Sequence, residues 1–337
     1  MKRKLLAYPL LLLFLLGCQP KTTVRYIQSL PQQVEEPVKI EPTPYVQEIP
    51  KTYEAQKISN APEPTPSIRI SSSTSEEKPQ EIQQQPIEEK IALGKLKIHY
   101  IDVGQGDGIL IQTPQGKNVL IDCGRWSSVA DYIRLQGISS IDVLITTHPD
   151  ADHIGGCDDV MAAMPIGAVY DNGGNTTTNA YAEYIALAKH KQYSVVKTDM
   201  ALTLDSLLDI QLIIPYDTGG LSEDNDDSIL VKIVYKNSSF LFTGDCEQSC
   251  EAEVLPTADL DVDVLKVAHH GSKTSTTQQF LDEVTPKYAI LSVGTNNYGH
   301  PSPEVIDRLT NAESEVHRTD LERTITITTD GDNYVVE

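Results

Sequence analysis

The residues best suited to chemistry lie together in the stretch His148-Pro149-Asp150-Ala151-Asp152-His153. Two imidazoles and two carboxylates occur there within six positions, directly after the apolar run 141–147, which predicts a buried strand. A metal site needs several ligands that converge on one point, and the end of a strand is a rigid place to mount them. Gly155 and Gly156 follow and allow a tight turn in which backbone could approach an ion. A merely solvated loop would not need so many ligand types so close together.

Further candidate ligands follow other apolar runs. Asp122 follows residues 118–121, Asp245 comes after the run that begins at residue 240, and the pair His269 and His270 follows residues 262–268. Each of these predicted strands is therefore followed by an acid or an imidazole. If the strand ends meet in the fold, the combined set can hold divalent ions. The ordered set of side chains predicts a metal centre.

The elements that must position these side chains alternate between strand and helix patterns. We expect strands at 96–103, 109–112, 118–121, 141–146, 208–214, 228–235, 239–242, 262–268, 288–293 and 324–328. We expect helices at 127–135, 156–164, 178–189, 246–253, 276–284 and 303–311. Several strands come as hairpin-like pairs, so the pattern predicts an α/β domain over residues 91–337, in which helices cover two mixed sheets.

The order and spacing of the motifs resemble the metallo-β-lactamase fold superfamily. They look most similar to the nuclease-like domain of the ComEC competence proteins, which handle DNA during uptake. The similarity runs from about residue 96 to the C terminus. It is carried by DVGQGD at 102–107, LIDCG at 120–124, HPDADHIGG at 148–156, NDDS at 225–228, TGD at 243–245, LKVAHHGS at 265–272, YGHP at 298–301 and RTD at 318–320. The resemblance implies a four-layer αββα sandwich that hydrolyses its substrate with bound metal.

The resemblance also implies roles for individual side chains. One metal ion would be held by His148 and Asp150, and the other by Asp152 and His153, with Asp245 bridging the two. Asp152 would also take part in catalysis. Asp150 stands where the HxHxDH motif of the superfamily has its second histidine, as it does in ComEC proteins. This oxygen ligand lowers the preference for zinc, so the expected cofactors are two divalent ions, Zn²⁺ or Mn²⁺, with Mg²⁺ possible.

Other residues are expected around this centre. His269 is our choice for the remaining imidazole ligand, and His270 would face the substrate as a catalytic residue if the strand continues. The two roles could be exchanged, because the strand could end one residue later. Asp122 is expected to orient a ligand from behind the centre. His300 could protonate a leaving oxygen, or it could make a structural hydrogen bond near a turn.

The segment after the histidine pair offers groups for an anionic substrate. A phosphate would dock just before a predicted helix, where the chain has the hydroxyl groups of Ser272 and Thr274. Lys273 adds a positive charge there and is expected to be a catalytic residue. Ser275 and Thr276 also follow there, and for them helix capping is the alternative. Asn225 and Ser228 match a family motif and are expected on the substrate side.

The front of the chain is a different kind of sequence. Residues 1–4 are basic, residues 5–16 are apolar, and the segment ending at Cys18 resembles a bacterial lipoprotein processing site. We therefore expect residues 1–17 to be a signal peptide and Cys18 to carry a lipid; an uncleaved anchor is the alternative. Residues 18–90 are rich in Pro, Gln, Glu, Ser and Thr, which predicts a disordered tether. The domain is then extracytoplasmic and membrane-attached, and no obligate protein partner is inferred.

The net charge and the cysteines limit the functions that the sequence allows. The chain has 27 basic and 48 acidic residues, a formal charge of −21, which disfavours non-specific binding to nucleic acid. Cys123, Cys157, Cys246 and Cys250 could form disulfides, pack as small buried side chains or bind metal. Three functions remain: a phosphodiesterase or nuclease acting on DNA or nucleotides, a hydrolase of another ester, lactone or amide, or a metal-binding interaction domain without catalysis.

Overall fold

A computed structural model of the chain describes residues 94–215 and 225–337. All of these residues belong to one unit, which spans residues 81–337. The predicted signal peptide, Cys18 and the predicted tether lie outside the described residues. Among the described helices, none has the length and apolar character needed to cross a membrane.

The first sheet has eight strands in the order β15-β14-β1-β2-β3-β4-β5-β6. Its strands are β1 (Leu96–Tyr100), β2 (Ile109–Gln112), β3 (Asn118–Ile121), β4 (Ile141–Thr146), β5 (Ile166–Asp171), β6 (Gln192–Val195), β14 (Ile325–Thr329) and β15 (Tyr334–Val336). Strands β1 to β3 are antiparallel neighbours, whereas β3 to β6 run parallel. The pairing therefore changes at β3.

The second sheet has seven strands in the order β13-β12-β11-β10-β9-β8-β7. Its strands are β7 (Met200–Ala201), β8 (Asp209–Ile213), β9 (Leu230–Tyr235), β10 (Ser238–Phe242), β11 (Val264–Lys266), β12 (Tyr288–Leu291) and β13 (Glu315–Arg318). Strands β7 to β10 are antiparallel, and β10 to β13 run parallel. The change of pairing at β10 mirrors the change at β3 in the first sheet.

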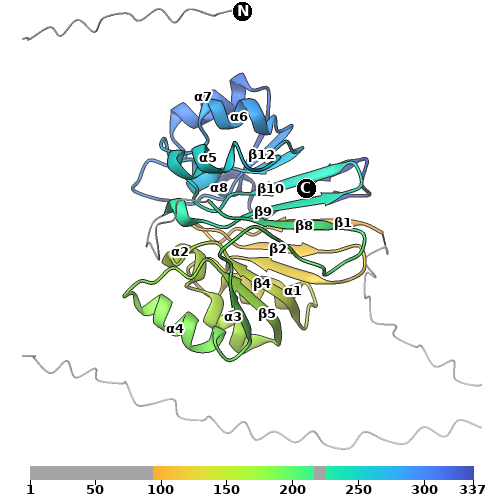
Figure 1. Ribbon diagram of the computed structural model, residues 1–337, viewed down its shortest axis with the longest axis vertical. Coiled ribbons are helices and arrows are strands. Elements are labelled where there is room, and N and C mark those ends of the chain that lie inside the picture. Colours follow the sequence, from red (N-terminus) through yellow and green to blue (C-terminus); the bar gives the residue numbers. More distant parts are fainter. Residues whose placement is uncertain (1–93, 216–224) are drawn as a thin grey trace, which may run out of the picture. The chain divides into compact units, whose positions relative to one another are not determined.

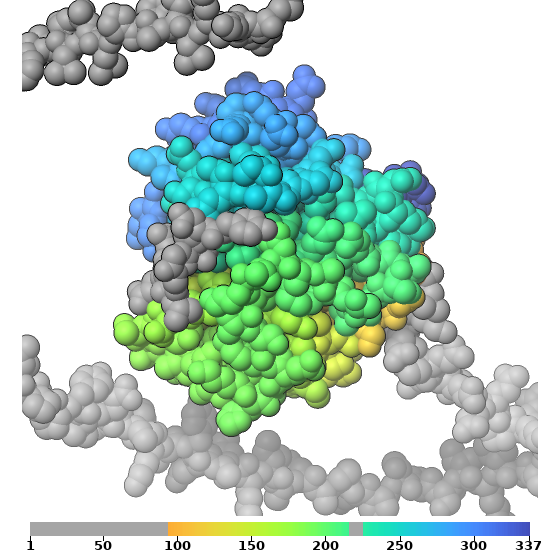
Figure 2. All heavy atoms as spheres, in the orientation of Figure 1, coloured from red at the N-terminus to blue at the C-terminus, as the bar shows by residue number. Residues whose placement is uncertain are grey.

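Helices cover the outer face of each sheet, and Figure 1 shows the resulting four layers. The helices are α1 (Ser128–Leu135), α2 (Ala151–Ile154), α3 (Cys157–Ala163), α4 (Asn179–Ala188), α5 (Gln248–Val254), α6 (Gln278–Val284), α7 (Pro303–Asn311) and α8 (Thr319–Glu322), with 3₁₀ turns η1 (Asn225–Asp227) and η2 (Ala268–Gly271). In the space-filling view, the green surface around α4 and the blue surface of α6 and α7 lie at opposite ends (Figure 2). The predicted αββα sandwich is confirmed.

Three apolar clusters hold the layers together. The central cluster lies between the sheets and includes Ile98 and Ile121 from the first sheet and Val231, Phe240 and Val264 from the second. A second cluster joins the first sheet to α1, α3 and α4, and a third joins the second sheet to α5, α6 and α7. Because β2, β3, β4 and β12 are covered on both faces, they are apolar runs rather than alternating strands.

Side-chain caps fix where several helices begin. Thr178 accepts a hydrogen bond from the Tyr181 N–H at the start of α4, and Ser302 caps α7 in the same way just before Pro303. The predicted strand 262–268 is shorter than expected, because β11 ends at Lys266 and the chain then turns into η2. This early end decides where the two adjacent histidines point.

Candidate metal centre

The candidate ligands lie where four strands end. β3 and β4 are parallel neighbours in the first sheet, and β10 and β11 are parallel neighbours in the second. Residues that follow parallel neighbours emerge at the same edge of a sheet, which is where α/β proteins commonly place ligands. The two edges meet, since His153 Nε2 from the first half of the domain lies 3.2 Å from Asp245 Oδ1 in the second. Both sheets therefore contribute to the centre.

The short helix α2 carries Asp152 and His153 into the centre. A Cβ atom at Gly155 or Gly156 would overlap carbonyl oxygens of the segment 123–126. The two glycines thus let the end of α2 pack directly on the loop that follows β3. We expected these glycines to let the backbone approach an ion; in the structure they let two backbone segments pack together.

Four buried polar atoms face one another without a hydrogen-bond partner among the described residues: Nε2 of His148, His153 and His270, and Oδ1 of Asp245. Asp245 Oδ2 lies 3.9 Å from the His148 nitrogen and 3.5 Å from the His270 nitrogen. An unsatisfied buried polar atom costs about 1–3 kcal/mol. Divalent cations accept lone pairs from both imidazole nitrogen and carboxylate oxygen, so this donor set fits bound metal.

Two further carboxylates lie at the solvent side of these atoms. Asp150 Oδ2 is 3.9 Å from His148 Nε2, and Asp152 Oδ2 is 3.5 Å from His270 Nε2. Their side chains are 50% and 27% exposed, so the centre is accessible to a substrate from this side. The carboxylates and imidazoles of the described residues form three potential ligand groups: His148, His153 and Asp245; Asp152, His153 and His270; and, further inside, Asp107, Asp122 and His153.

Asp122 holds His153 from behind. Its Oδ2 atom accepts hydrogen bonds from His153 Nδ1 and the Thr147 hydroxyl, both at 2.8 Å, and its Oδ1 atom accepts one from the Thr147 N–H, also at 2.8 Å. The carboxylate is fully buried. A carboxylate on Nδ1 fixes the ring orientation and leaves Nε2 free to face a metal. This geometry is what the predicted orienting role of Asp122 requires.

Of the two adjacent histidines, His270 rather than His269 belongs to a potential ligand group, which favours the exchanged assignment. His270 is buried, donates from Nδ1 to the Ser292 carbonyl at 2.8 Å and directs Nε2 at the acidic ligand atoms. The prediction assumed that strand alternation extends to these residues, and that assumption is wrong. Both histidines lie beyond β11 with left-handed φ angles of 45° and 52°. Such strained backbone is commonly found at functional sites.

His269 instead forms a pair with Glu247 at the rim of the centre. Its Nδ1 atom lies 2.6 Å from Glu247 Oε1, which also accepts a hydrogen bond of 2.7 Å from the Thr274 hydroxyl. Its Nε2 atom is 3.6 Å from Asp245 Oδ2, and its side chain is 22% exposed. His269 therefore borders both the ligand atoms and solvent, and Glu247 fixes its orientation.

The charges of the centre are strongly interdependent. Burial opposes charge on His153, yet the carboxylates of Asp245 and Asp122 raise its pKa well above the usual value. Burial also opposes charge on Asp245, but His270 and His153 hold its pKa well below the usual value. Burial and the neighbouring His153 lower the pKa of His148. In the metal-free protein a proton on His153 offsets the acidic charge, so metal binding is linked to proton release.

The predicted substrate residues divide into two groups. Ser228 is completely buried, and its hydroxyl accepts a hydrogen bond from the Asp245 N–H at 3.1 Å and lies 3.4 Å from His148 Nδ1. Ser228 therefore supports candidate ligands from behind, which corrects its expected place on the substrate side. Asn225 is at the rim, with its side-chain nitrogen 3.4 Å from His269 Nδ1.

The loop after η2 also departs in part from expectation. The Ser272 hydroxyl is nearly buried and lies 2.7 Å from that of Thr274, which itself donates to the rim carboxylate. Lys273 is exposed. Thr277, one residue later than expected, provides the helix cap of α6. His300 is partly buried and packs on His269, with ring centroids 5.2 Å apart.

A buried ion pair behind the ligands was not foreseen. Lys266 Nζ lies 2.5 Å from Asp107 Oδ2 and donates to the Gly244 carbonyl at 3.3 Å. Both side chains are almost completely buried, and the Asp107 N–H donates to the Asp152 carbonyl at 3.2 Å. Asp107 belongs to the DVGQGD stretch, and Lys266 is a charge inside an apolar strand. The acid in this motif and the lysine in an apolar strand were the sequence features that could have indicated the pair.

The four cysteines form two disulfides, which settles the alternatives left by the sequence. Cys123 pairs with Cys157, and Cys246 pairs with Cys250. The first joins the loop after β3 to α3, and the second joins the residue after Asp245 to α5. All four side chains are buried. The disulfides therefore brace segments that adjoin candidate ligands, and none of the four sulfurs is a free metal ligand.

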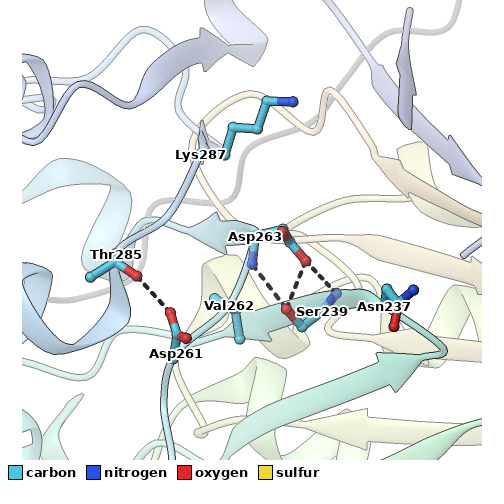
Figure 3. A pocket seen from close by; sticks show the side chains of 7 residues that line it. All are labelled: Asn237, Ser239, Asp261, Val262, Asp263, Thr285 and Lys287. Atoms are coloured by element: carbon cyan, nitrogen blue, oxygen red, sulfur yellow. Dashed lines mark hydrogen bonds between the residues drawn. The ribbon is translucent and has the colours of Figure 1, made fainter. Parts of the chain in front are cut away.

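A separate hollow of about 350 Å³ is lined by Asn237, Ser239, Asp261, Val262, Asp263, Thr285 and Lys287. Figure 3 shows that its acids are engaged locally: Asp263 accepts from the Ser239 N–H and hydroxyl, and Asp261 accepts from the Thr285 hydroxyl. These carboxylates are satisfied without a ligand. The hollow therefore offers no comparable chemistry.

Comparisons with known proteins agree with this geometry. Residues 101–295 match the metallo-β-lactamase superfamily. ComE operon protein 3 of Bacillus subtilis is 29% identical over 252 residues, which cover 68% of this chain and 32% of that protein. Recombination protein 2 of Haemophilus influenzae is 30% identical over 232 residues, covering 66% of this chain and 27% of that protein. The chain thus spans about a third or less of the length of these relatives.

Among solved structures, the metallo-β-lactamase fold protein YhfI from Bacillus subtilis is similar to the chain with a TM-score of 0.45 and 13% identity. The match covers 66% of this chain and 97% of YhfI. The family match covers more than half of the chain and includes every candidate ligand described above. The chain belongs to the metallo-β-lactamase superfamily of metal-dependent hydrolases and is similar to the ComEC-like competence proteins.

Proposed function

We propose that this protein is a metal-dependent phosphodiesterase that acts on nucleotides or short stretches of DNA. The observation that carries the proposal is the convergence of three buried imidazole nitrogens on Asp245, with two more carboxylates on the solvent side. Divalent ions held there would activate a water and neutralise charge on both the attacking and the leaving oxygen of a phosphodiester. The similarity to competence and recombination proteins supports a substrate of this class.

We assign the ligands from the geometry. His148 and Asp150 would hold one ion and Asp152 and His270 the other, and Asp245 lies between the two groups. His153 stands between the two groups, where Asp122 fixes its ring. Because carboxylate oxygens are as numerous as imidazole nitrogens in this set, manganese and magnesium compete with zinc for it.

His269 is then the residue that acts on the substrate, held in place by Glu247. Its partial exposure and its position 3.6 Å from Asp245 Oδ2 support a role in donating a proton to the leaving oxygen. Thr274 adds a second hydrogen bond to Glu247 and so restrains the pair. The net charge of −21 disfavours long polyanions, which supports small or short substrates.

The location is part of the proposal. A lipid on Cys18 and a tether over residues 18–90 would hold the domain outside the cytoplasm. The two disulfides support this, because such bonds persist in oxidising compartments and are rare in the cytosol.

The test compares substrates of different bond types. Purified protein supplied with Mn²⁺ or Zn²⁺ is assayed on bis(p-nitrophenyl) phosphate, labelled single-stranded DNA, p-nitrophenyl acetate and a lactone. We expect turnover of the phosphodiesters, its loss in Asp245→Asn and its retention in Asp282→Asn, an exposed acid that bonds to Gln278. Faster hydrolysis of the acetate or the lactone, with intact phosphodiesters, would assign the site to another class of hydrolase.

A further inference from the structure

A row of rings leads outward from the metal centre. His269, at the rim, packs edge-on against His300 with ring centroids 5.2 Å apart. His300 in turn packs against Tyr298 at 5.7 Å. The Tyr298 side chain lies at the outer end of the row and is 74% exposed. An aromatic ring two contacts away from His269 is thus open to solvent beyond the rim of the centre.

The exposed ring sits on a restrained loop. The Asn296 side-chain oxygen accepts hydrogen bonds of 3.0–3.1 Å from the N–H groups of Tyr298, Gly299 and His300. The Asn296 side-chain nitrogen donates to the carbonyls of Gly294 at 2.9 Å and His300 at 2.7 Å. One amide side chain therefore fixes the turn from both directions. A preorganised ring loses little conformational entropy when it binds a ligand.

Electrostatics limit what this ring can recognise. Lys273 is the only lysine or arginine in the segment 269–277, and the buried Lys266 is already paired with Asp107. Acidic residues outnumber basic ones by 48 to 27 in the chain, so its net charge of −21 does not favour binding the rest of a phosphorylated ligand through charge. Stacking needs no charge, and it is how proteins bind bases irrespective of sequence.

We propose that Tyr298 is a stacking platform for a nucleobase, so that the substrates of this centre are nucleotides or single-stranded nucleic acid. The phosphate would bind at the metal centre and the attached base would lie on Tyr298. This inference rests on the proposed phosphodiesterase function and adds the group that the protein recognises beside the phosphate.

The experiment measures binding without turnover. The full-length, Mn²⁺-loaded protein is titrated calorimetrically with deoxyadenosine 5′-monophosphate and, separately, with 2-deoxyribose 5-phosphate, which has the same phosphate but no base. The two ligands are compared for the unmodified chain, Tyr298→Ala and Tyr298→Phe. Leu135→Ala is the control, because it removes an 83% exposed apolar side chain from α1 on the outer face of the first sheet.

We expect the unmodified chain and Tyr298→Phe to bind the nucleotide about 5- to 150-fold more tightly than the sugar phosphate, the range given by about 1–3 kcal/mol of stacking per base. Tyr298→Ala should abolish that preference and leave sugar phosphate binding unchanged; Leu135→Ala should match the unmodified chain. Equal binding of the two ligands by the unmodified chain, or a preference that survives Tyr298→Ala, overturns the inference. A protein that shows the preference but cleaves no phosphodiester would refute the proposed function instead.

Discussion

Breaking the buried pair of Lys266 and Asp107 should destabilise the domain more than any surface ion pair would. The lysine nitrogen and the Asp107 carboxylate are 2.5 Å apart, and the two side chains are 0% and 2% exposed. Lys266→Met removes the cation and leaves a buried carboxylate without its partner. Breaking a buried pair in this way costs about 3–5 kcal/mol, a large share of a typical total stability of about 5–15 kcal/mol.

A double-mutant cycle isolates the pair from other effects of each change. Asp107→Asn alone should also destabilise, because it leaves the lysine ammonium buried and unpaired. The double variant should be less destabilised than the sum of the single changes by about 2–3 kcal/mol. Lys232→Met is the matched control, since Lys232 is also largely buried but pairs with the 85% exposed Asp259, where about 0–1 kcal/mol is expected.

The free energy of unfolding is measured by chemical denaturation with intact disulfides and excess chelator, so that metal does not contribute. Metal affinity is measured separately by competition with a chromophoric chelator. Because Lys266 also holds the Gly244 carbonyl next to Asp245, we expect Lys266→Met to weaken metal binding about 10- to 100-fold. Additive single effects, or a control as costly as Lys266→Met, would refute this account of the pair.

Four further outcomes are expected. Asp245→Ala should abolish hydrolysis and lower bound metal while far-UV circular dichroism stays unchanged, because the apolar clusters hold the fold. His270→Ala should lose metal by elemental analysis, whereas His269→Ala should keep metal and lose about 10²–10⁴-fold in kcat. Cys18→Ser should release the chain from membranes in a fractionation experiment. Burial lowers the pKa of His99 from 6.5 to about 4, so between these pH values the unfolded chain binds more protons than the folded one. The free energy of unfolding should therefore fall by up to about 3 kcal/mol on acidification. Denaturation curves of His99→Gln should lack this pH dependence.

Strong local patterns made much of the fold and the centre predictable. Each buried apolar run that was interpreted as a strand is one, and the acids and imidazoles that follow these runs do meet at one place. The strands missing from the prediction were β5, β6, β7, β13 and β15. Each of them contains at least one exposed residue, and β7 has only two residues. Their pairing depends on neighbouring strands rather than on a pattern of their own.

The roles of His269 and His270 could not be assigned from the sequence, because they depend on where one strand ends. β11 stops at Lys266, and the next turn places both histidines in left-handed backbone that only tertiary contacts stabilise. Glu247 and Asp107 were missed for a related reason. Their partners lie 22 and 159 positions away along the chain, and a single sequence does not encode such proximity.

The way the centre is assembled connects its charge to its fold. The first sheet provides His148 and His153 after β4, and the second provides Asp245 and His270 after β10 and β11, so neither half alone forms the site. Without a metal ion, buried carboxylates and imidazoles from the two halves face one another, and protons offset part of the acidic charge. Bound metal would replace those protons, and candidate ligands from both halves would hold it. The disulfides and the pair of Lys266 and Asp107 act in the same place, because each braces a segment next to a ligand. These contacts therefore reinforce the sandwich where the candidate ligands of its two sheets meet.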